Sequence, residues 1–484
     1  MAVITNADQA DSANADPAHR QVQTLMSRAR AAQTRFAGFD QAAVDRCVLA
    51  AGWAIMEPGR NRELAELAVS DTGLGNVPDK ILKNHRKTLG LLRDLADART
   101  VGVIRDDPLT GITEIARPVG VIAAITPSTN PGATPANKII NALKCRNAII
   151  VAPSPKGWRT AERLISFVQD ELVRVGTDPE LARGLVQLLP APVTKAGTHA
   201  LMRAADLIVA TGSQANIRAA YSSGTPAFGV GAGNVAAIVD ASADPAAAAA
   251  RIAVSKTFDN ATSCSSENAV VILDAAYDAT IAALQANGGV MLGSADKARL
   301  QDALWPAGRL SSTLIAQAAD DIAQRAGLSA GSDAGTRFLM VSESGFGPQF
   351  PFSGEKLAPV LAVYRARDFD DAIRLVAGIY AYQGAGHSVG LHSAHESHAR
   401  ALAERLPVSR VIVNQAHCIA TGGSFDNGLP FSLSMGCGTW GGNGFSENLN
   451  YRHYMNVTRI ARVIPACEPG EGQIFGAYFD THGR

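Results

Sequence analysis

Short apolar segments alternate with helical patterns along most of this chain. The first five lack any period-two alternation of apolar and polar residues (119–126, 148–152, 185–189, 206–210 and 235–239). A second set lies between about residues 245 and 435 (270–273, 338–341, 360–363, 388–391 and 410–413). Uninterrupted apolar runs of this length are typical of strands buried on both faces of a parallel sheet. The pattern therefore predicts an α/β fold.

The first hundred or so residues follow a different pattern. Residues 1 to about 18 are polar, and we expect them to be loose. Apolar residues from 20 to 98 recur with helical spacing, with breaks at Pro58-Gly59 and at 73–75. Residues 101–117 alternate around an Asp-Pro-Leu-Thr-Gly turn, which predicts a β-hairpin.

Length and composition exclude several classes of protein. A chain of 484 residues exceeds one hydrophobic core, so we expect at least two domains. Lys plus Arg and Asp plus Glu both number 44, which gives no general attraction to nucleic acid or membranes, and no apolar run approaches a membrane span. The six cysteines lack CxxC spacing, which argues against a metal site and favours a reducing compartment. With no secretory signal either, we expect a cytoplasmic protein.

Cys264 lies in the most informative stretch of the sequence. A helix-favouring run with six alanines, residues 244–256, ends in Asp-Asn, and a hydroxyl-rich turn holding this thiol follows before the apolar run 269–273. A thiol on a small-residue loop between regular elements can be reached by a substrate and activated as a nucleophile. The alternative is a small buried hydrophobic residue, which is what most cysteines are.

Two glycine-rich segments and one Thr-Gly-Ser turn are candidates for contact with a ligand. Residues 229–234 lack the G-x-G-x-x-G dinucleotide spacing, because position 234 is Asn. Residues 211–213 follow a strand and precede a helix, so the helix N-terminus could present amides to a phosphate. The density of glycines around Trp440, in residues 436–444, suggests backbone that passes close to another surface or a ligand.

Several of these segments together resemble the CoA-acylating branch of the aldehyde dehydrogenase superfamily. The matching stretches run in family order over roughly residues 115–460 (117–131, 219–234, 255–264, 355–360, 386–387 and 436–443). The resemblance implies an aldehyde dehydrogenase-like α/β fold with a Rossmann-like cofactor domain, an α/β catalytic domain and a β-hairpin oligomerisation element. It also implies NAD or NADP bound without the usual glycine fingerprint, and a homodimer or homotetramer.

The resemblance divides the chain into four parts. We expect a loose N-terminus (1–18) and a cofactor-binding domain (19–242) that carries the hairpin at about 101–117. A catalytic domain with Cys264 (243–435) follows, and the last segment (436–484) is expected to return to the cofactor domain and to take part in oligomerisation.

The resemblance also implies catalytic roles. Cys264 is the expected nucleophile, and Asn130 together with the backbone N–H of Cys264 would stabilise the oxyanion. Asn130 directly precedes Pro131, whereas hydrolytic relatives place this Asn two residues before the proline. His387 stands where acylating members tend to carry a histidine, with a structural histidine as the alternative.

For the cofactor, the resemblance implies that Glu355 binds the nicotinamide ribose and that the turn at Thr211 lies near the phosphates. The expected cofactor-binding residues are Thr126, Pro127, Ser154, Lys156, Thr211, Gly212, Ser213, Gly231 and Glu355. NADP is slightly favoured over NAD, because residues 153–159 contain no acid and Lys156 and Arg159 could meet a 2′-phosphate.

The lack of a water-activating glutamate points to coenzyme A as the co-substrate. Hydrolytic aldehyde dehydrogenases carry a glutamate that activates water, but the matching residues 229–233 contain no ionisable group. Without a positioned base, attack by water loses a factor on the order of 10²–10⁴. A thiol acceptor needs less help, because thiolate is available near neutral pH.

The substrate is the least determined part. Overall likeness leans towards members that act on sulfoacetaldehyde, and Arg452, beside His453, is a candidate donor to the sulfonate. A surface arginine or a subunit contact is the alternative for Arg452. Acetaldehyde and succinate semialdehyde are alternative substrates, and an inactive scaffold of the same fold is the alternative of another class.

Overall fold

A bundle of helices opens the described chain. The computed structural model describes residues 17–231 and 233–484. The expected loose segment 1–18 lies outside the described residues except for its last two positions, which belong to the first helix. The helices are α2 (Pro17–Phe36), α3 (Gln41–Met56), α4 (Pro58–Thr72) and α5 (Val77–Leu95). Both predicted breaks are confirmed, since Pro58 begins α4 and Gly73 ends it in a left-handed conformation (φ 67°).

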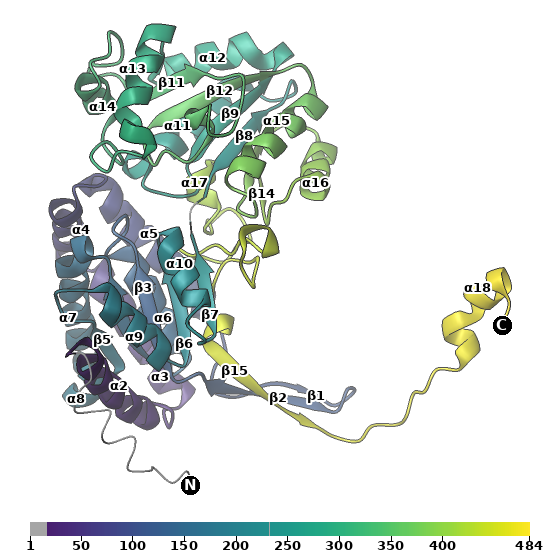
Figure 1. Ribbon diagram of the computed structural model, residues 1–484. Coiled ribbons are helices and arrows are strands. Elements are labelled where there is room, and N and C mark those ends of the chain that lie inside the picture. Colours follow the sequence, from purple (N-terminus) through teal and green to yellow (C-terminus); the bar gives the residue numbers. More distant parts are fainter. Residues whose placement is uncertain (1–16, 232) are drawn as a thin grey trace.

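The predicted hairpin is confirmed and forms part of a projecting arm. Strands β1 (Gly102–Asp107) and β2 (Ile112–Pro118) pair antiparallel. Strand β15 (Met455–Ala461), which the sequence pattern did not predict, pairs antiparallel with β2 and completes a three-stranded sheet. This arm extends from the body of the molecule (Figure 1).

The first unit is a five-stranded parallel sheet in the order β5-β4-β3-β6-β7. Its strands are β3 (Val121–Thr126), β4 (Ala148–Pro153), β5 (Val186–Leu188), β6 (Leu207–Thr211) and β7 (Ala227–Val230). Its helices are α6 (Ala133–Lys144), α7 (Trp158–Arg174), α8 (Pro179–Leu185), α9 (Lys195–Ala204) and α10 (Gln214–Tyr221). Every residue of β3 and β4 is buried, as their unbroken apolar pattern predicts.

The second unit is a seven-stranded parallel sheet in the order β10-β11-β12-β9-β8-β13-β14. Its strands are β8 (Val235–Val239), β9 (Glu267–Leu273), β10 (Gly289–Met291), β11 (Phe338–Ser342), β12 (Val360–Ala366), β13 (Val389–His392) and β14 (Val411–Val413). Its helices are α11 (Pro245–Thr257), α12 (Tyr277–Ala286), α13 (Ser294–Leu304), α14 (Ala319–Arg325), α15 (Phe369–Tyr382), α16 (Glu396–Arg405) and α17 (His417–Ala420).

Strand β8 belongs to the seven-stranded sheet, and not to the five-stranded sheet in which we expected it. Residues 235–239 were placed in the cofactor domain, but β8 pairs with β9 and β13 in the seven-stranded sheet. The fifth strand of the first sheet is instead β7, which runs into the glycine-rich segment. The two apolar runs look alike in sequence because both are buried, so only the pairing distinguishes them.

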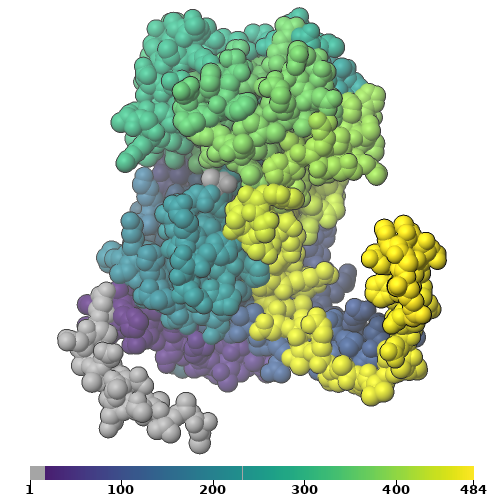
Figure 2. Space-filling view, turned by 45° about the vertical axis from the view of Figure 1, so that its right-hand side comes forward, coloured from purple at the N-terminus to yellow at the C-terminus, as the bar shows by residue number. Residues whose placement is uncertain are grey.

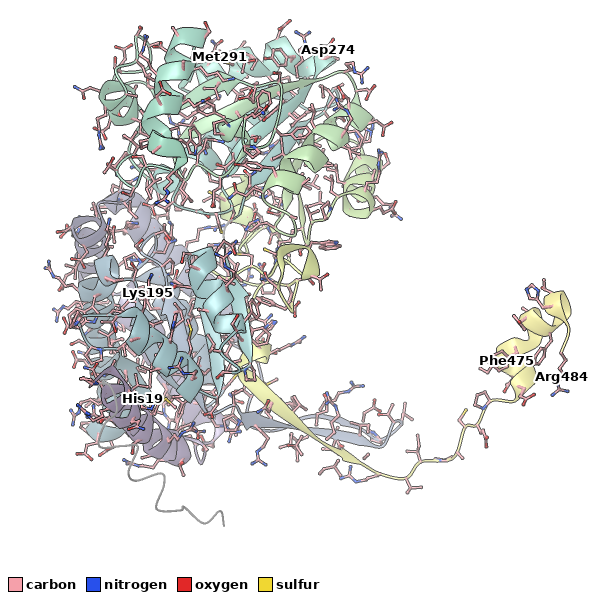
Figure 3. All side chains as sticks on the ribbon, in the orientation of Figure 1. His19, Lys195, Asp274, Met291, Phe475 and Arg484 are labelled. Atoms are coloured by element: carbon pink, nitrogen blue, oxygen red, sulfur yellow. The ribbon has the colours of Figure 1, made fainter. Side chains whose placement is uncertain are left out.

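The C-terminal part returns to the first unit and then leaves the body. Phe431, Phe445, Leu449 and Tyr454 pack into the same core as the five-stranded sheet, so the return begins a few residues before the expected position 436. Helix α18 (Glu471–His482) stands apart from both units (Figures 1 and 2). Its Phe475 lies far from the rest of the molecule (Figure 3). Among the described helices, none is long and apolar enough to cross a membrane.

Candidate active site

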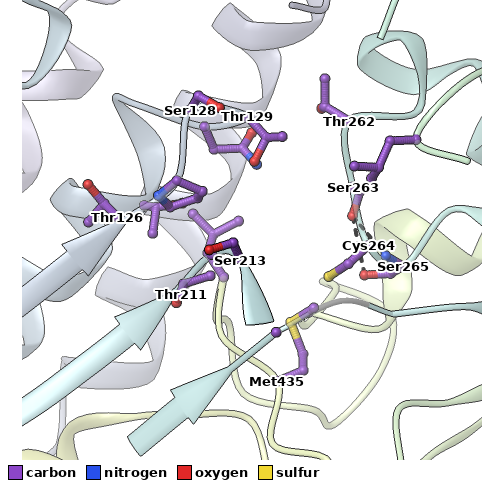
Figure 4. Close-up of a pocket in the computed structure, with 18 of the residues that line it drawn as sticks. Thr126, Ser128, Thr129, Thr211, Ser213, Thr262, Ser263, Cys264, Ser265 and Met435 are labelled. Carbon is purple, nitrogen blue, oxygen red and sulfur yellow. Dashed lines mark hydrogen bonds between the residues drawn. The ribbon is translucent and has the colours of Figure 1, made fainter. Parts of the chain in front are cut away.

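The largest group of predicted site residues lines one cavity between the two units. This cavity has a volume of about 400 Å³. The first unit contributes the carboxyl ends of its strands, and the second contributes the loops that precede β9 and β12. In Figure 4, Thr126 and Thr211 of the first unit lie on one side of the pocket and the loop that carries Cys264 lies on the other. Predicted residues on its wall are Thr126, Pro127, Asn130, Ser154, Thr211, Gly212, Ser213, Gly231, Cys264 and Glu355.

One end of the cavity fits a nucleotide cofactor. Ser213 caps the N-terminus of α10, as residues 211–213 predicted, so the helix directs amides at this end. Thr126 Oγ1 is buried there without a hydrogen-bond partner among the described residues. An unpaired buried hydroxyl that lines a cavity is a group available to a ligand.

Glu355 also lines the cavity. Its carboxylate accepts a hydrogen bond from the backbone N–H of Gly233 at 3.2 Å. Burial raises the pKa of Glu355 to about 8. A ligand that donates hydroxyl hydrogen bonds would favour the charged form and lower that pKa again. This environment suits a carboxylate that meets a ribose.

Lys156 does not line the cavity. It is exposed on a short 3-10 helix (Pro155–Gly157) that follows β4. Arg159 is less free than the sequence suggested, because its Nη1 lies 3.4 Å from Asp71 Oδ1. Asp71 also accepts from the backbone N–H of Thr160 at 3.0 Å. An acid therefore does lie beside this segment, brought from α4, although none occurs within residues 153–159.

Cys264 is partly buried and lines the cavity. Burial first, and then the charges of Glu355 and Cys437, raise its pKa to about 12. The thiol is therefore protonated at neutral pH in the resting protein. A nucleophilic role requires a base within reach, and His387 provides one, with Nε2 3.6 Å from Sγ.

His387 is held by a chain of hydrogen bonds. Its Nδ1 lies 2.7 Å from Ser388 Oγ, which lies 2.8 Å from His417 Nε2. Burial lowers the pKa of both histidines, so both are neutral. If His387 Nδ1–H donates to Ser388 and the hydroxyl donates to His417, His387 Nε2 is left as an acceptor facing the thiol. The hydrogen-bond network accommodates this tautomer, in which Cys264 has a proton acceptor.

A close backbone approach keeps His387 in place. Gly386 has a φ of 86°, and a Cβ on it would lie 1.9 Å from the carbonyl oxygen of Cys437. Arg410 Nη1 donates both to the His387 carbonyl at 3.1 Å and to the Gly436 carbonyl at 2.9 Å. The glycine-rich segment 436–444 thus packs against another part of the backbone, as its composition predicted.

The turn before Cys264 is strained and anchored by two lysines. Asp259, Asn260 and Ala261 all have positive φ (50°, 51° and 59°), which costs energy in residues with a Cβ. Buried Asp259 Oδ2 accepts from Lys83 Nζ at 2.5 Å and from Lys80 Nζ at 3.1 Å. These ion pairs attach the nucleophile loop to α5.

Lys83 also orients the expected oxyanion residue. Its Nζ donates to Asn130 Oδ1 at 2.7 Å. An ammonium has only donors, so the Asn130 oxygen must face Lys83 and its Nδ2 must point elsewhere. Asn130 lines the cavity, and its Nδ2 is therefore available to an oxygen that develops charge there.

Arg452 is not brought to this cavity. It is exposed on a 3-10 helix (Tyr451–Tyr454), its Nε lies 3.4 Å from the Tyr451 hydroxyl, and it lines a separate hollow beside β15. Within the described chain, the expectation that Arg452 meets a substrate at Cys264 was wrong.

Several residues of the site were missed. Lys87, Thr134, Asn216, Cys418 and Ser432 also line the cavity, and Lys83, Ser388 and His417 support it. A signal existed for the lysines. Lys80, Lys83 and Lys87 recur at helical spacing, and all three are buried on one face of α5.

Comparison with known proteins defines the class. The profile of the aldehyde dehydrogenase family matches residues 2–298. The chain is 62% identical over 470 residues to sulfoacetaldehyde dehydrogenase (acylating) of Cupriavidus necator, covering 97% of this chain and 94% of that protein. It is 40% identical to sulfoacetaldehyde dehydrogenase (acylating) of Bilophila wadsworthia, covering 96% and 99%. An acetylating aldehyde dehydrogenase from Geobacillus thermoglucosidasius superposes with a TM-score of 0.89 at 34% identity, covering 94% and 98%.

This chain belongs to the aldehyde dehydrogenase family. The predicted resemblance to the acylating branch and the predicted fold class are confirmed by these relatives.

Proposed function

We propose that this protein is a CoA-acylating aldehyde dehydrogenase that converts sulfoacetaldehyde, CoA and NAD(P)⁺ to sulfoacetyl-CoA and NAD(P)H. The observation that carries the acylating chemistry is the pairing of partly buried Cys264 with neutral His387, in a site whose residues 229–233 hold no ionisable group. The substrate rests on the 62% identity to an enzyme of that name over almost the whole chain. Acetaldehyde and succinate semialdehyde are the competing substrates.

Cys264, His387 and Asn130 carry the chemical roles in this reaction. Cys264 Sγ attacks the aldehyde carbon while its proton passes to His387 Nε2, giving a thiohemiacetal. Asn130 Nδ2 and the backbone N–H of Cys264 stabilise the oxyanion. A bound nicotinamide cofactor would supply the hydride acceptor, and loss of the hydride from the thiohemiacetal leaves a thioester on Cys264. His387 releases that proton to solvent and then takes the proton of the CoA thiol, whose sulfur attacks the thioester. Cys264 leaves as the thiol when His387 returns this proton to its sulfur.

CoA dependence tests this proposal. At enzyme concentrations above a few micromolar, omission of CoA should limit the NAD(P)H formed to a burst of at most one equivalent per active site. Addition of CoA should restore turnover. Residues 229–233 hold no carboxylate to activate water, and water is a weaker acid and nucleophile than a thiol, so the CoA-free rate should be lower by a factor on the order of 10²–10⁴. Sustained CoA-independent production of the free acid would exclude the acylating assignment.

We further propose that the adenosine ribose end favours NADP⁺. Lys156 follows β4, where it can approach a 2′-phosphate, but Asp71 beside Arg159 weakens the second contact that the sequence suggested. The test compares kcat/KM for the two cofactors in the wild type and in Lys156→Ala. A wild-type preference for NAD⁺ that the variant leaves unaltered would reject the NADP⁺ proposal.

The projecting arm supports a homodimer or homotetramer. Residues beyond β15 expose apolar side chains, among them Val463, Ile464, Ile474, Phe475 and Tyr478, which a partner copy would cover. We propose a cytoplasmic location, because all six cysteines, each in the described part of the chain, are free thiols.

A further inference from the structure

A second, smaller hollow adjoins the Cys264 cavity and is lined by three cations from one helix. We call it the cationic recess; its walls are Lys83, Arg86, Lys87, Asn130, Phe258, Ser263, Cys418, Ile419 and Leu433. Lys87, Asn130, Ser263, Cys418 and Leu433 also line the main cavity. The recess therefore opens beside the oxyanion residue and beside the neighbour of the nucleophile.

Two of these cations have only neutral partners. Lys87 Nζ donates to the carbonyls of Gly422 at 2.8 Å and Gly423 at 3.3 Å. Arg86 donates to the Ile419 carbonyl at 3.2 Å and to Ser424 Oγ at 2.7 Å. Within residues 17–231 and 233–484, neither forms an ion pair with a carboxylate.

The acids nearest to the recess are otherwise engaged. Asp259 is shared between Lys80 and Lys83. Asp426 lies near enough to raise the pKa of Arg86 against the lowering effect of burial, but it accepts its hydrogen bond from Ser424. The recess thus keeps an excess of positive charge.

A buried cation without a counter-ion is unfavourable. Burial first, and then the neighbouring charge of Arg86, lower the pKa of Lys87 to about 7. A neutral aldehyde would leave that penalty in place, whereas an anionic group in the recess would stabilise the ammonium form. The recess is therefore built for a substrate that carries its own negative charge.

We propose that the cationic recess holds the sulfonate of the aldehyde substrate, with Lys87 and Arg86 as its main donors. This inference rests on the proposed function and assigns it a specificity site in place of Arg452. One methylene separates the carbonyl carbon from the sulfur of sulfoacetaldehyde. Because Asn130 and Ser263 border both hollows, the carbonyl can lie at Cys264 while the sulfonate lies in the recess.

The donor set suits three oxygens. An ammonium and a guanidinium provide charge-assisted hydrogen bonds from different directions, and the Ser263 hydroxyl adds a neutral donor. Ser263 Oγ lies 3.2 Å from Ser265 Oγ, a weak contact that an anion can replace.

The experiment compares substrates in Lys87→Met and Arg86→Gln, with Arg452→Gln as a matched loss of one cation outside the recess. The readout is the ratio of kcat/KM for sulfoacetaldehyde to that for propanal. Each recess variant should lower this ratio by about 10- to 100-fold, the effect of one hydrogen bond to a charged group. Arg452→Gln should keep the wild-type ratio.

A binding assay tests the recess without requiring catalytic turnover by the variants. Isethionate, a non-reactive C2 sulfonate, should slow alkylation of Cys264 by iodoacetamide in the wild-type enzyme and in Arg452→Gln. The same concentration should protect Lys87→Met at least about 10-fold less. Lys87→Arg, which keeps the charge, should retain part of the protection.

The failures are distinguishable. Wild-type enzyme that does not turn over sulfoacetaldehyde with CoA rejects the proposed function, and the recess with it. Wild-type turnover with an unchanged substrate ratio in both recess variants, or a selective loss in Arg452→Gln, rejects the recess alone. Succinate semialdehyde outperforming sulfoacetaldehyde, with the same dependence on Lys87, would show that the recess takes a carboxylate and overturn the sulfonate assignment.

Discussion

Replacement of Lys83 by Met tests whether the oxyanion site is oriented by a buried ammonium. Methionine keeps most of the length and apolar volume of the side chain, but it removes the donor 2.7 Å from Asn130 Oδ1. The Asn130 amide can then rotate or turn its oxygen towards the substrate. Loss of an oxyanion donor lowers kcat by about 10²–10³-fold. Because Asn130 remains present, we expect a decrease of about 10- to 100-fold in kcat.

Stability must be separated from catalysis, because Lys83 also pairs with Asp259. Loss of one partner of a buried ion pair costs about 3–5 kcal/mol when the other charge is left alone. Asp259 would keep Lys80 at 3.1 Å, the backbone N–H of Asn76 at 2.9 Å and the Thr262 hydroxyl at 2.8 Å. We therefore expect a loss of about 1–3 kcal/mol in the free energy of unfolding.

Lys80→Met is the matched control. It removes a second lysine from the same carboxylate and should lower the melting temperature similarly, but it leaves the contact between Lys83 and Asn130 intact. The assay is kcat from NAD(P)H absorbance at saturating substrates, together with the melting temperature of each variant. Equal losses of kcat in Lys80→Met and Lys83→Met would refute the reasoning.

A double-mutant cycle adds a second check. If Lys83 acts through Asn130, Asn130→Ala should lower kcat at least as much as Lys83→Met, and the double variant should resemble Asn130→Ala alone. Multiplicative losses would mean that the two residues act independently.

Three further outcomes follow from the same site. Cys264→Ser should abolish aldehyde oxidation while leaving cofactor binding and the melting temperature nearly intact, and activity above a few per cent would show that another thiol is the nucleophile. Ser388→Ala should lower kcat by about 10-fold or more and alter its pH profile, because His387 loses the partner that fixes its tautomer; an unchanged profile would leave Ser388 a packing role. Lys87 has a pKa lowered to about 7 by burial, so its anion-binding protonated form is lost as pH rises through that value. The ratio of kcat/KM for sulfoacetaldehyde to that for propanal should therefore fall from pH 6 to pH 8 in the wild type but not in Lys87→Arg, and a flat wild-type ratio would contradict this.

Local patterns determined most of the architecture. The apolar runs predicted the buried parallel strands, and Pro58 and Gly73 marked helix boundaries because of their own backbone restrictions. Cys264 was identifiable because a thiol in a small hydroxyl-rich loop between a helix and a strand is visible in sequence. Strand β15 was missed, because an exposed arm strand carries no apolar pattern.

Tertiary structure alone decided which charges act at the site. The sequence spacing of the lysines on α5 is the same whether they face water or a buried carboxylate. Asp259, the carboxylate that they meet, lies 176 residues from Lys83 in the sequence. Likewise, Arg452 looked suitable for a sulfonate because guanidinium chemistry is local, but the fold places it in another hollow. A side chain's chemistry is fixed by its own residue. Its partners, its burial and hence its proton affinity are fixed by segments distant in sequence that packing brings together.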